Sequence, residues 1–254
     1  MLRVRVIPCL QLLNENLVKT VCFKKPGYIG DFINTARIFN ELEVDEMCVL
    51  GIRNTKQNRA PDFQVLQHLA NECFMPLSYG GGINSFEMGK EILAMGYEKL
   101  VVNSHNFQDL KLIERLAGHF GRQSVVVSID VKKNWRGKQL VYSESGQRKT
   151  TLTAEKWAME LESAGAGEIL LTSIDAEGTW EGFDVELTRN VTKSVSIPVI
   201  AHGGAGNIDH VREVVKKGGA SAVALGSMVV YQKKDMGVLV NFPDRQELLN
   251  ALST

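Results

Sequence analysis

Two stretches of the chain combine a glycine turn with a later serine at the same spacing. "GGG" at 80–82 and "GGAG" at 203–206 each follow a short apolar run, and Ser104 and Ser227 end the next run. Gly80 and Gly203 are 123 residues apart, and so are the two serines. Glycines before a helix let backbone N–H groups approach an anion, and the helix start adds partial positive charge. The pattern predicts two phosphate sites, although such glycines can also simply make tight turns.

The residues expected at these sites come from the glycine turns and from the strand ends that follow them. Two sites on opposite sides of one opening would suit a ligand with a phosphate at each end. We expect the first site to contain Gly81, Gly82, Asn103 and Ser104, and the second to contain Gly203, Gly204, Gly226 and Ser227.

Composition and charge exclude several other kinds of function. The chain has 254 residues, 29 basic and 29 acidic, so its formal charge of zero supports neither a nucleic-acid nor a membrane partner. Its four cysteines, Cys9, Cys22, Cys48 and Cys73, lack the spacing of a zinc site or a disulfide framework, and we expect no metal and no cofactor. No apolar run approaches the roughly 20 residues of a membrane span. No signal-peptide pattern follows the first residues, so a cytoplasmic protein is expected.

The elements that would position these residues alternate regularly along the chain. Eight apolar, β-rich runs are separated by amphipathic stretches such as 31–43, 85–96, 153–166 and 207–218. This alternation indicates a parallel sheet, and eight units most simply close as a (β/α)8 TIM barrel in a single domain, 1–254. An open doubly wound sheet is the alternative, but it explains neither the count nor the repeat, which predicts half-barrels at approximately 1–122 and 123–254. The expected strands are 3–10, 46–50, 75–79, 99–103, 124–129, 168–173, 197–201 and 222–227.

Charged residues are predicted at the strand starts, at the other end of the barrel. Arg5, Lys99 and Glu168 are each an even number of residues from another polar residue near the end of the same strand. Side chains alternate between the two faces of a strand, so both members of each pair should face the barrel interior. With Glu46 they make two basic and two acidic side chains, and charges inside a barrel are costly unless they are paired. Taken by themselves, these residues would form a ring of paired charges that plugs the barrel floor. The parity partners at the strand ends are Gln11, Asn103 and Thr172.

Segments over essentially the whole chain resemble the cyclase subunit of imidazole glycerol phosphate synthase, the histidine-biosynthesis barrel that pairs with a glutaminase. They are "VIPCL", "LVKT", "YGGGI", "VVVSID", "GAGEILLTSID", "EGT" and "GGAG". The isomerase of the same pathway shares the glycine turns but not "GAGEILLTSID". The resemblance implies a lyase- or synthase-type subunit of a glutamine amidotransferase complex. It also implies that Arg5, Glu46, Lys99 and Glu168 gate the entrance of ammonia.

The same resemblance implies a catalytic set, with departures. Asp130 matches the acid that ends the fifth strand, whereas Gln11 stands where the family has its second acid, an aspartate. An amide cannot exchange a proton near neutral pH, so Gln11 is expected to orient the substrate. Gly51 and Glu177 also replace aspartates. The positions that match the family are Lys19, Asn103, Thr172 and Gly178, together with the glycine turns.

These departures favour a diverged paralogue over the histidine enzyme. The opening stretch looks like paralogues from surface-polysaccharide (lipopolysaccharide, O-antigen) clusters, where acetamido sugars become acetamidino sugars. Such a protein would take ammonia from a HisH-like glutaminase at its N-terminal face, near Glu98 and Gln123, and use it on a phosphorylated sugar-type substrate. A separate sugar amidotransferase could also be needed. The alternatives are the histidine-pathway cyclase, with Asp130 alone or with Glu177 as a substitute acid, and a non-catalytic scaffold that conducts ammonia to a third protein.

Three further side chains are left without a role by the sequence. His202 precedes the second glycine turn, and Trp180 follows "EGT". Trp135 lies in a polar segment expected to be a loop or hairpin beside Asp130. Each could face a ligand or be structural.

Overall fold

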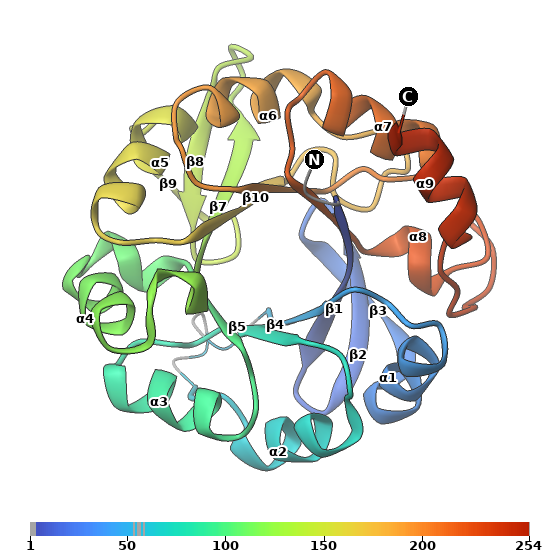
Figure 1. The fold of residues 1–254 in the computed structure, drawn as a ribbon. Coiled ribbons are helices and arrows are strands. Elements are labelled where there is room, and N and C mark those ends of the chain that lie inside the picture. The colour runs from blue at the N-terminus through green and yellow to red at the C-terminus, as the bar shows by residue number, and fades with distance from the viewer. Residues whose placement is uncertain (1–3, 53, 55–56, 58, 254) are drawn as a thin grey trace.

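Eight parallel strands close into a barrel in the computed structural model, which describes residues 4–52, 54, 57 and 59–253 (Figure 1). Around the barrel the order is β10, β11, β12, β1, β4, β5, β6 and β7, and β10 also pairs with β7. This closure confirms the predicted TIM barrel and rules out the open sheet. The barrel strands are β1 (Arg5–Leu13), β4 (Met47–Gly51), β5 (Leu77–Gly80), β6 (Lys99–Val102), β7 (Val125–Lys133), β10 (Glu168–Ser173), β11 (Val199–His202) and β12 (Ala222–Leu225).

Each of the eight predicted runs overlaps one of these strands, and the ends differ, most at β1 and β7, which continue to Leu13 and Lys133. The first run was expected to begin at Arg3, which lies outside the described residues, and β1 begins at Arg5. The half-barrel repeat remains a prediction.

Helices cover the outside of the barrel, and several begin at a side chain that caps them. Asp31, Asp62, Ser85, Asp184 and Asn207 each accept a hydrogen bond from a backbone N–H of the first turn, as good N-caps do. The four helices predicted from sequence are confirmed as α1, α3, α5 and α7. The helices are α1 (Phe32–Glu41), α2 (Phe63–Glu72), α3 (Phe86–Ala94), α4 (Lys111–Phe120), α5 (Ala154–Ser163), α6 (Val185–Thr192), α7 (Ile208–Lys216), α8 (Ser227–Val230) and α9 (Arg245–Ser253), with 3-10 turns η1 (Ser104–Phe107) and η2 (Arg122–Ser124).

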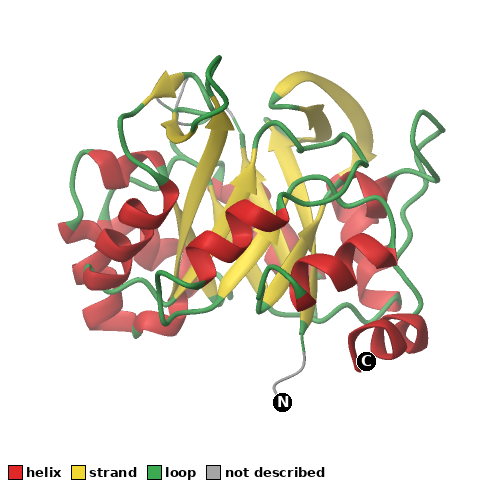
Figure 2. Cartoon of the chain, turned by 90° about the horizontal axis from the view of Figure 1, so that it is seen from above, coloured by secondary structure: helices red, strands yellow, loops and turns green. Residues whose placement is uncertain are grey.

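Two antiparallel hairpins rise from the end of the barrel at which the strands finish (Figure 2). The first is β2 (Asn16–Val21) and β3 (Lys24–Asp31), where β2 pairs with the end of β1. The second is formed by the end of β7 and β8 (Gln139–Ser143), joined by a turn at 134–138, and the short β9 (Arg148–Lys149) pairs with β8. The second confirms the hairpin expected beside Asp130. We call this end of the barrel the mouth and the opposite end the floor.

The buried apolar side chains form two clusters. The larger packs the helices on the outside of the barrel, and the smaller fills the interior between floor and mouth. Cys9 and Cys48 are register partners in this interior cluster, and both are buried. Within the described part of the chain, the helices are all too short or too polar to traverse a lipid bilayer.

Candidate functional site

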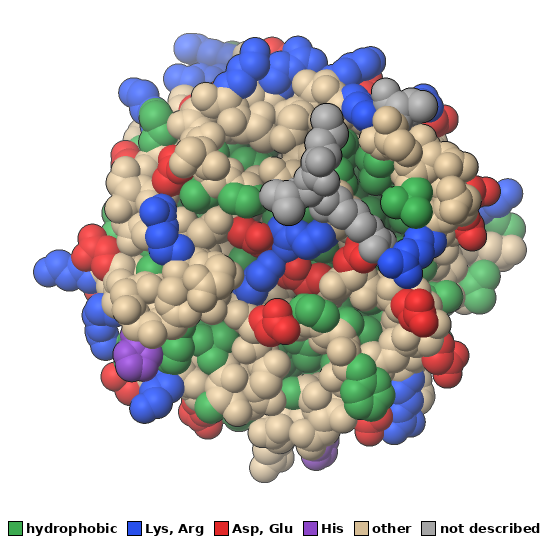
Figure 3. Space-filling model, viewed as in Figure 1, with side chains coloured by type: hydrophobic (Ala, Val, Ile, Leu, Met, Phe, Trp, Pro, Cys, Tyr) green, Lys and Arg blue, Asp and Glu red, His purple; other side chains and the backbone are tan. Residues whose placement is uncertain are grey.

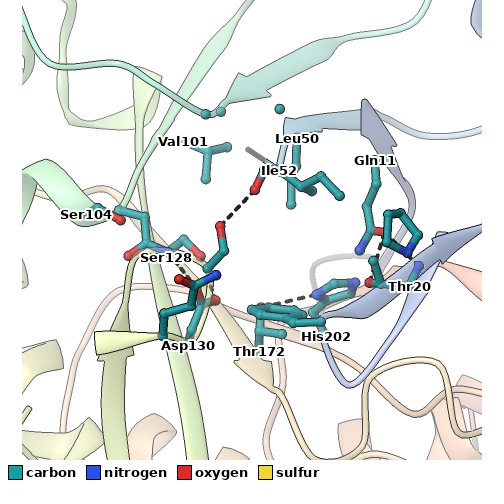
Figure 4. A pocket seen from close by; sticks show the side chains of 18 of the residues that line it. Gln11, Thr20, Leu50, Ile52, Val101, Ser104, Ser128, Asp130, Thr172 and His202 are labelled. Atoms are coloured by element: carbon teal, nitrogen blue, oxygen red, sulfur yellow. Dashed lines mark hydrogen bonds between the residues drawn. The ribbon is translucent and has the colours of Figure 1, made fainter. Parts of the chain in front are cut away.

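The mouth holds a cavity of about 170 Å³ formed by the ends of the strands. The structure brings Gln11, Asp130 and Thr172 together around it, as predicted from sequence (Figure 4). Asn103 also lines this cavity. Most of the other polar groups on its wall are neutral hydroxyls and amides. They belong to Thr20, Ser104, Ser128, Ser145 and Gln147, with His202 and Lys25 also on the lining.

Asp130 is the carboxylate on the wall of this cavity, and it is only 5% exposed. Burial raises its pKa from 3.8 to about 6, although hydrogen bonds from Asn103, Ser128 and Thr172 oppose the shift. Asn103 Nδ2 donates to Asp130 Oδ2 at 2.8 Å. Asn103 Oδ1 is buried and has no partner among the described residues. A carboxyl group with this pKa can both release and accept a proton near neutral pH.

The Gln11 side chain is held at both ends by protein groups. Its Oε1 accepts from the backbone N of Thr20 at 3.0 Å and from the Thr20 hydroxyl at 3.1 Å. Its Nε2 lies 3.3 Å from Glu177 Oε1. Gln11 therefore ties β1 to the β2–β3 hairpin, and a substrate would have to share or displace these bonds to be oriented by it.

Lys19 and Glu177 form a buried ion pair beside Gln11, with 4% and 1% of their side chains exposed. Burial alone would raise the pKa of Glu177, but the charge and hydrogen bond of Lys19 and the Phe23 N–H outweigh it and lower the pKa. Glu177 is therefore an anion at neutral pH, which disfavours it as a substitute acid. Glu177 Oε2 accepts from Phe23 N at 3.0 Å and its carbonyl accepts from Cys22 N at 2.8 Å, so this residue also fastens the first hairpin to the mouth.

A second, smaller cavity of about 10 Å³ lies beside the main one. The structure gathers around it the predicted residues of the second phosphate site, the ion pair, and Gly178, one of the positions that match the family. These lining residues are Lys19, Glu177, Gly178, Gly203, Gly204, Gly226 and Ser227. Of the residues predicted for the first phosphate site, Gly81, Asn103 and Ser104 line the main cavity.

The glycine turns also have a packing role that does not depend on any anion. A Cβ on Gly204 would lie 1.9 Å from the Gly182 carbonyl oxygen, and one on Gly81 would lie 2.3 Å from that of Gly51. Gly82 is less crowded, because the nearest atoms, at 3.0 Å, belong to Arg59 and Asn54. Both the anion hypothesis and the tight-turn alternative therefore remain physically reasonable, and bulky substitutions at these glycines would perturb the loops themselves.

His202 is the site residue that the sequence did not assign. It is 5% exposed at the end of β11 and lines both cavities. Burial, and secondly the charge of Lys19, lower its pKa to about 4, so the imidazole is neutral near pH 7. Its position before "GGAG" was visible in the sequence, but its contacts were not. Trp135 is 84% exposed in the second hairpin, and neither it nor Trp180 is among the described residues lining the main cavity.

The four charged residues of the floor form a closed network, which we call the charged ring. Arg5 contacts Glu46 at 2.5 Å and Glu168 at 2.7 Å. Lys99 contacts the same two carboxylates at 3.0 and 3.1 Å. Burial would lower the pKa of Arg5, but the two carboxylates outweigh it and raise the pKa. The predicted clustering of these residues is confirmed, and acidic and basic side chains meet at the middle of this face (Figure 3).

A further small cavity lies between the charged ring and the mouth. Its volume is about 10 Å³, and Glu46, Cys48 and Ser78 are on its wall with apolar side chains of the interior cluster. Space of this size accommodates about one water-sized molecule.

Comparison with known proteins gives consistent matches over nearly the full length. Residues 5–235 match the family model described as histidine biosynthesis protein. A Pseudomonas aeruginosa protein, provisionally named imidazole glycerol phosphate synthase subunit hisF2, is 47% identical over 98% of this chain and 99% of its own. A Vibrio vulnificus protein, provisionally named subunit hisF3, is 38% identical over 99% of this chain and 97% of its own. The imidazole glycerol phosphate synthase subunit HisF of a Nostoc species is 39% identical over 95% of both chains.

Proposed function

Because this chain belongs to the histidine biosynthesis protein family, and within it to the HisF-like cyclase subunits, we propose that it takes ammonia from a glutaminase partner and uses it on a phosphorylated sugar-type substrate. The product would be an amidino sugar for a surface polysaccharide, made in the cytoplasm. Activation of the amide could require a separate sugar amidotransferase.

The observation that carries this proposal is the altered chemistry of the mouth. Asp130 keeps a pKa suited to proton transfer, whereas Gln11 replaces an expected acid and is engaged by Thr20 and Glu177. The wall between them consists mainly of hydroxyl and amide groups, which suit the hydroxyl-rich surface of a sugar. A reaction that needs two carboxylic acids on opposite sides of the mouth is less compatible with this arrangement.

The charged ring and the small cavity above it support the passage of ammonia. Lys99 contacts two carboxylates through a long, flexible stem, so its ammonium group can move while Arg5 still pairs with both acids. Ammonia is close to water in size, so the cavity between ring and mouth is large enough for one molecule.

The floor also has features of a docking surface for the glutaminase. Phe74 precedes β5 at the floor and is 89% exposed, yet its backbone N–H donates to Asn40 Oδ1 at 3.0 Å. An exposed aromatic side chain on a fixed backbone is a suitable anchor for a partner. Glu98 and Gln123 lie just before neighbouring strands of the same face, where they were expected to make contact.

The alternative is the cyclase reaction of histidine biosynthesis, which the name of the Nostoc relative favours. Purified protein should be given ammonium with the histidine-pathway precursor, and separately with phosphorylated acetamido sugars and the sugar amidotransferase. Mass spectrometry would detect replacement of an amide oxygen by nitrogen. We expect turnover of the precursor to be about 10²–10⁴-fold below that of a HisF enzyme with both acids. Equal turnover would contradict the proposal, and no conversion of either substrate would favour the scaffold.

A further inference from the structure

His202 occupies the boundary between the two cavities of the mouth. It ends β11 and is on the wall of the main cavity with Asp130 and on the wall of the smaller one with Lys19 and Ser227. A ligand that extended from the first predicted phosphate site to the second would pass this imidazole. A buried histidine in this position contacts the region where chemistry would occur, rather than the apolar core.

Three adjacent strands place Asp130, Thr172 and His202 in one row (Figure 4). Thr172 of β10 is the register partner of Asp130 on β7 and of His202 on β11. The Thr172 hydroxyl lies 3.1 Å from His202 Nδ1. Its hydrogen-bonding influence also lowers the pKa of Asp130, its register partner on the other side. A hydroxyl both donates and accepts, so it can connect two groups that exchange a proton.

We propose that Asp130, Thr172 and His202 form a proton relay, in which His202 is the second acid–base group of the mouth and replaces the function lost at Gln11. When Asp130 is protonated, it donates to Thr172, and Thr172 donates to Nδ1, so the imidazole carries its proton on Nε2. Transfer along the row moves the Asp130 proton to Thr172 and the Thr172 proton to Nδ1, while Nε2 releases its proton to the substrate. Asp130 is then an anion and His202 carries its proton on Nδ1, so charge and protons balance.

The charges that face His202 favour this role. Lys19 and burial disfavour the imidazolium, Glu177 favours it, and Asp130 is connected to it through Thr172. His202 is therefore a neutral imidazole with one ring proton, and it would carry a second proton only transiently. The proposal rests on the proposed function in one respect: a phosphate bound at the glycine turn beside the smaller cavity would partly neutralise Lys19 and raise the pKa of His202 by about 1 to 3.

The relay predicts a change of tautomer that NMR can detect without a substrate. In ¹⁵N-histidine-labelled protein, the ring proton of His202 should move from Nε2 to Nδ1 as Asp130 ionises near pH 6, while the ring stays neutral. The ¹⁵N chemical shifts of the two ring nitrogens should therefore swap. His202→Gln identifies the signals. Thr172→Val should abolish this change of tautomer, Thr172→Ser should retain it, and Asp130→Asn should remove its pH dependence. His68→Gln, on the outer helix α2, is the matched control that should change nothing at His202.

The outcomes separate the relay from the proposed function. A His202 tautomer that does not respond near pH 6, or that responds equally in Thr172→Val, would overturn the relay. Inorganic phosphate is the probe for the smaller cavity, and an increase in the protonation midpoint of His202 supports both ideas. If the tautomer change is present but phosphate has no effect on stability or on His202, the relay stands and the phosphate site of the proposed function fails.

Discussion

Replacement of Lys19 by methionine should destabilise the protein strongly, because it leaves the Glu177 carboxylate buried without its cation. Both side chains are almost fully buried, at 4% and 1% exposed. Removal of one partner from such a pair costs about 3–5 kcal/mol of unfolding free energy. Glu177 would keep three weaker donors, Thr20 Oγ1, Gln11 Nε2 and Phe23 N, so we expect the lower half of that range at pH 7.5.

The loss in Lys19→Met should shrink as the pH falls. In the wild type the pKa of Glu177 is lowered. Its contribution to the free energy of unfolding is therefore constant at any pH above the usual pKa of a glutamate. Without Lys19, burial raises that pKa, and the folded protein takes up a proton that the unfolded chain does not. Each pH unit below the new pKa then recovers up to about 1.4 kcal/mol. Urea unfolding followed by circular dichroism at pH 7.5 and 5.5 measures the difference, and other buried groups cancel between variant and wild type.

Two further variants make this prediction specific. Lys19→Met combined with Glu177→Gln removes both charges and should be less destabilised than Lys19→Met alone, whereas independent effects would add. Lys217→Met removes an exposed partner of Glu213 and should leave stability unchanged. A loss below about 1 kcal/mol in Lys19→Met, or a loss that is the same at both pH values, would refute the account of the buried pair.

Three other predictions follow from the site. Asp130→Asn should reduce ammonia-dependent turnover by about 10²–10⁴-fold. The pKa of Asp130 is about 6 in the folded protein, compared with an ordinary value of 3.8. The substitution should therefore also raise the free energy of unfolding by up to about 3 kcal/mol above pH 6 but not below pH 4, as measured by urea unfolding. Gln11→Asp should increase turnover of the histidine precursor relative to Gln11→Asn, but only in part, since Glu177 lies 3.3 Å from the Gln11 amide; no gain would contradict the role assigned to the lost acid. Lys99→Ala should leave folding largely intact and change the product formed per glutamine hydrolysed, relative to free ammonium as donor; unchanged coupling would indicate that the charged ring is only a plug.

The barrel could be predicted from sequence because each strand is an apolar run bounded by helical segments. The charged ring could also be predicted, since strand parity alone directs Arg5, Lys99 and Glu168 to the interior. The β2–β3 hairpin could not, because its turn places Cys22, Phe23 and Lys25 in the left-handed region without a glycine to signal it.

The site was predictable in its positions but not in its connections. Asp130 and Gln11 were located through the family resemblance, yet the bonds that hold Gln11 depend on how the first hairpin folds back to Glu177. The row from Asp130 to His202 depends on the register of three strands that are separated along the chain by helices. A pattern of residue types does not contain that register, so His202 was visible but could not be assigned.

The start of β1 has a practical consequence for laboratory work with this protein. Arg5 is both the first residue of β1 and a member of the charged ring, so a purification tag fused at the N-terminus would be attached only a few residues from the ring. Such a tag would obstruct the surface on which a partner is expected and could give a false negative in any binding assay. A label or surface attachment point is better placed at the opposite end, in the exposed turn of the second hairpin around Trp135, where immobilised protein would present its floor to the solution.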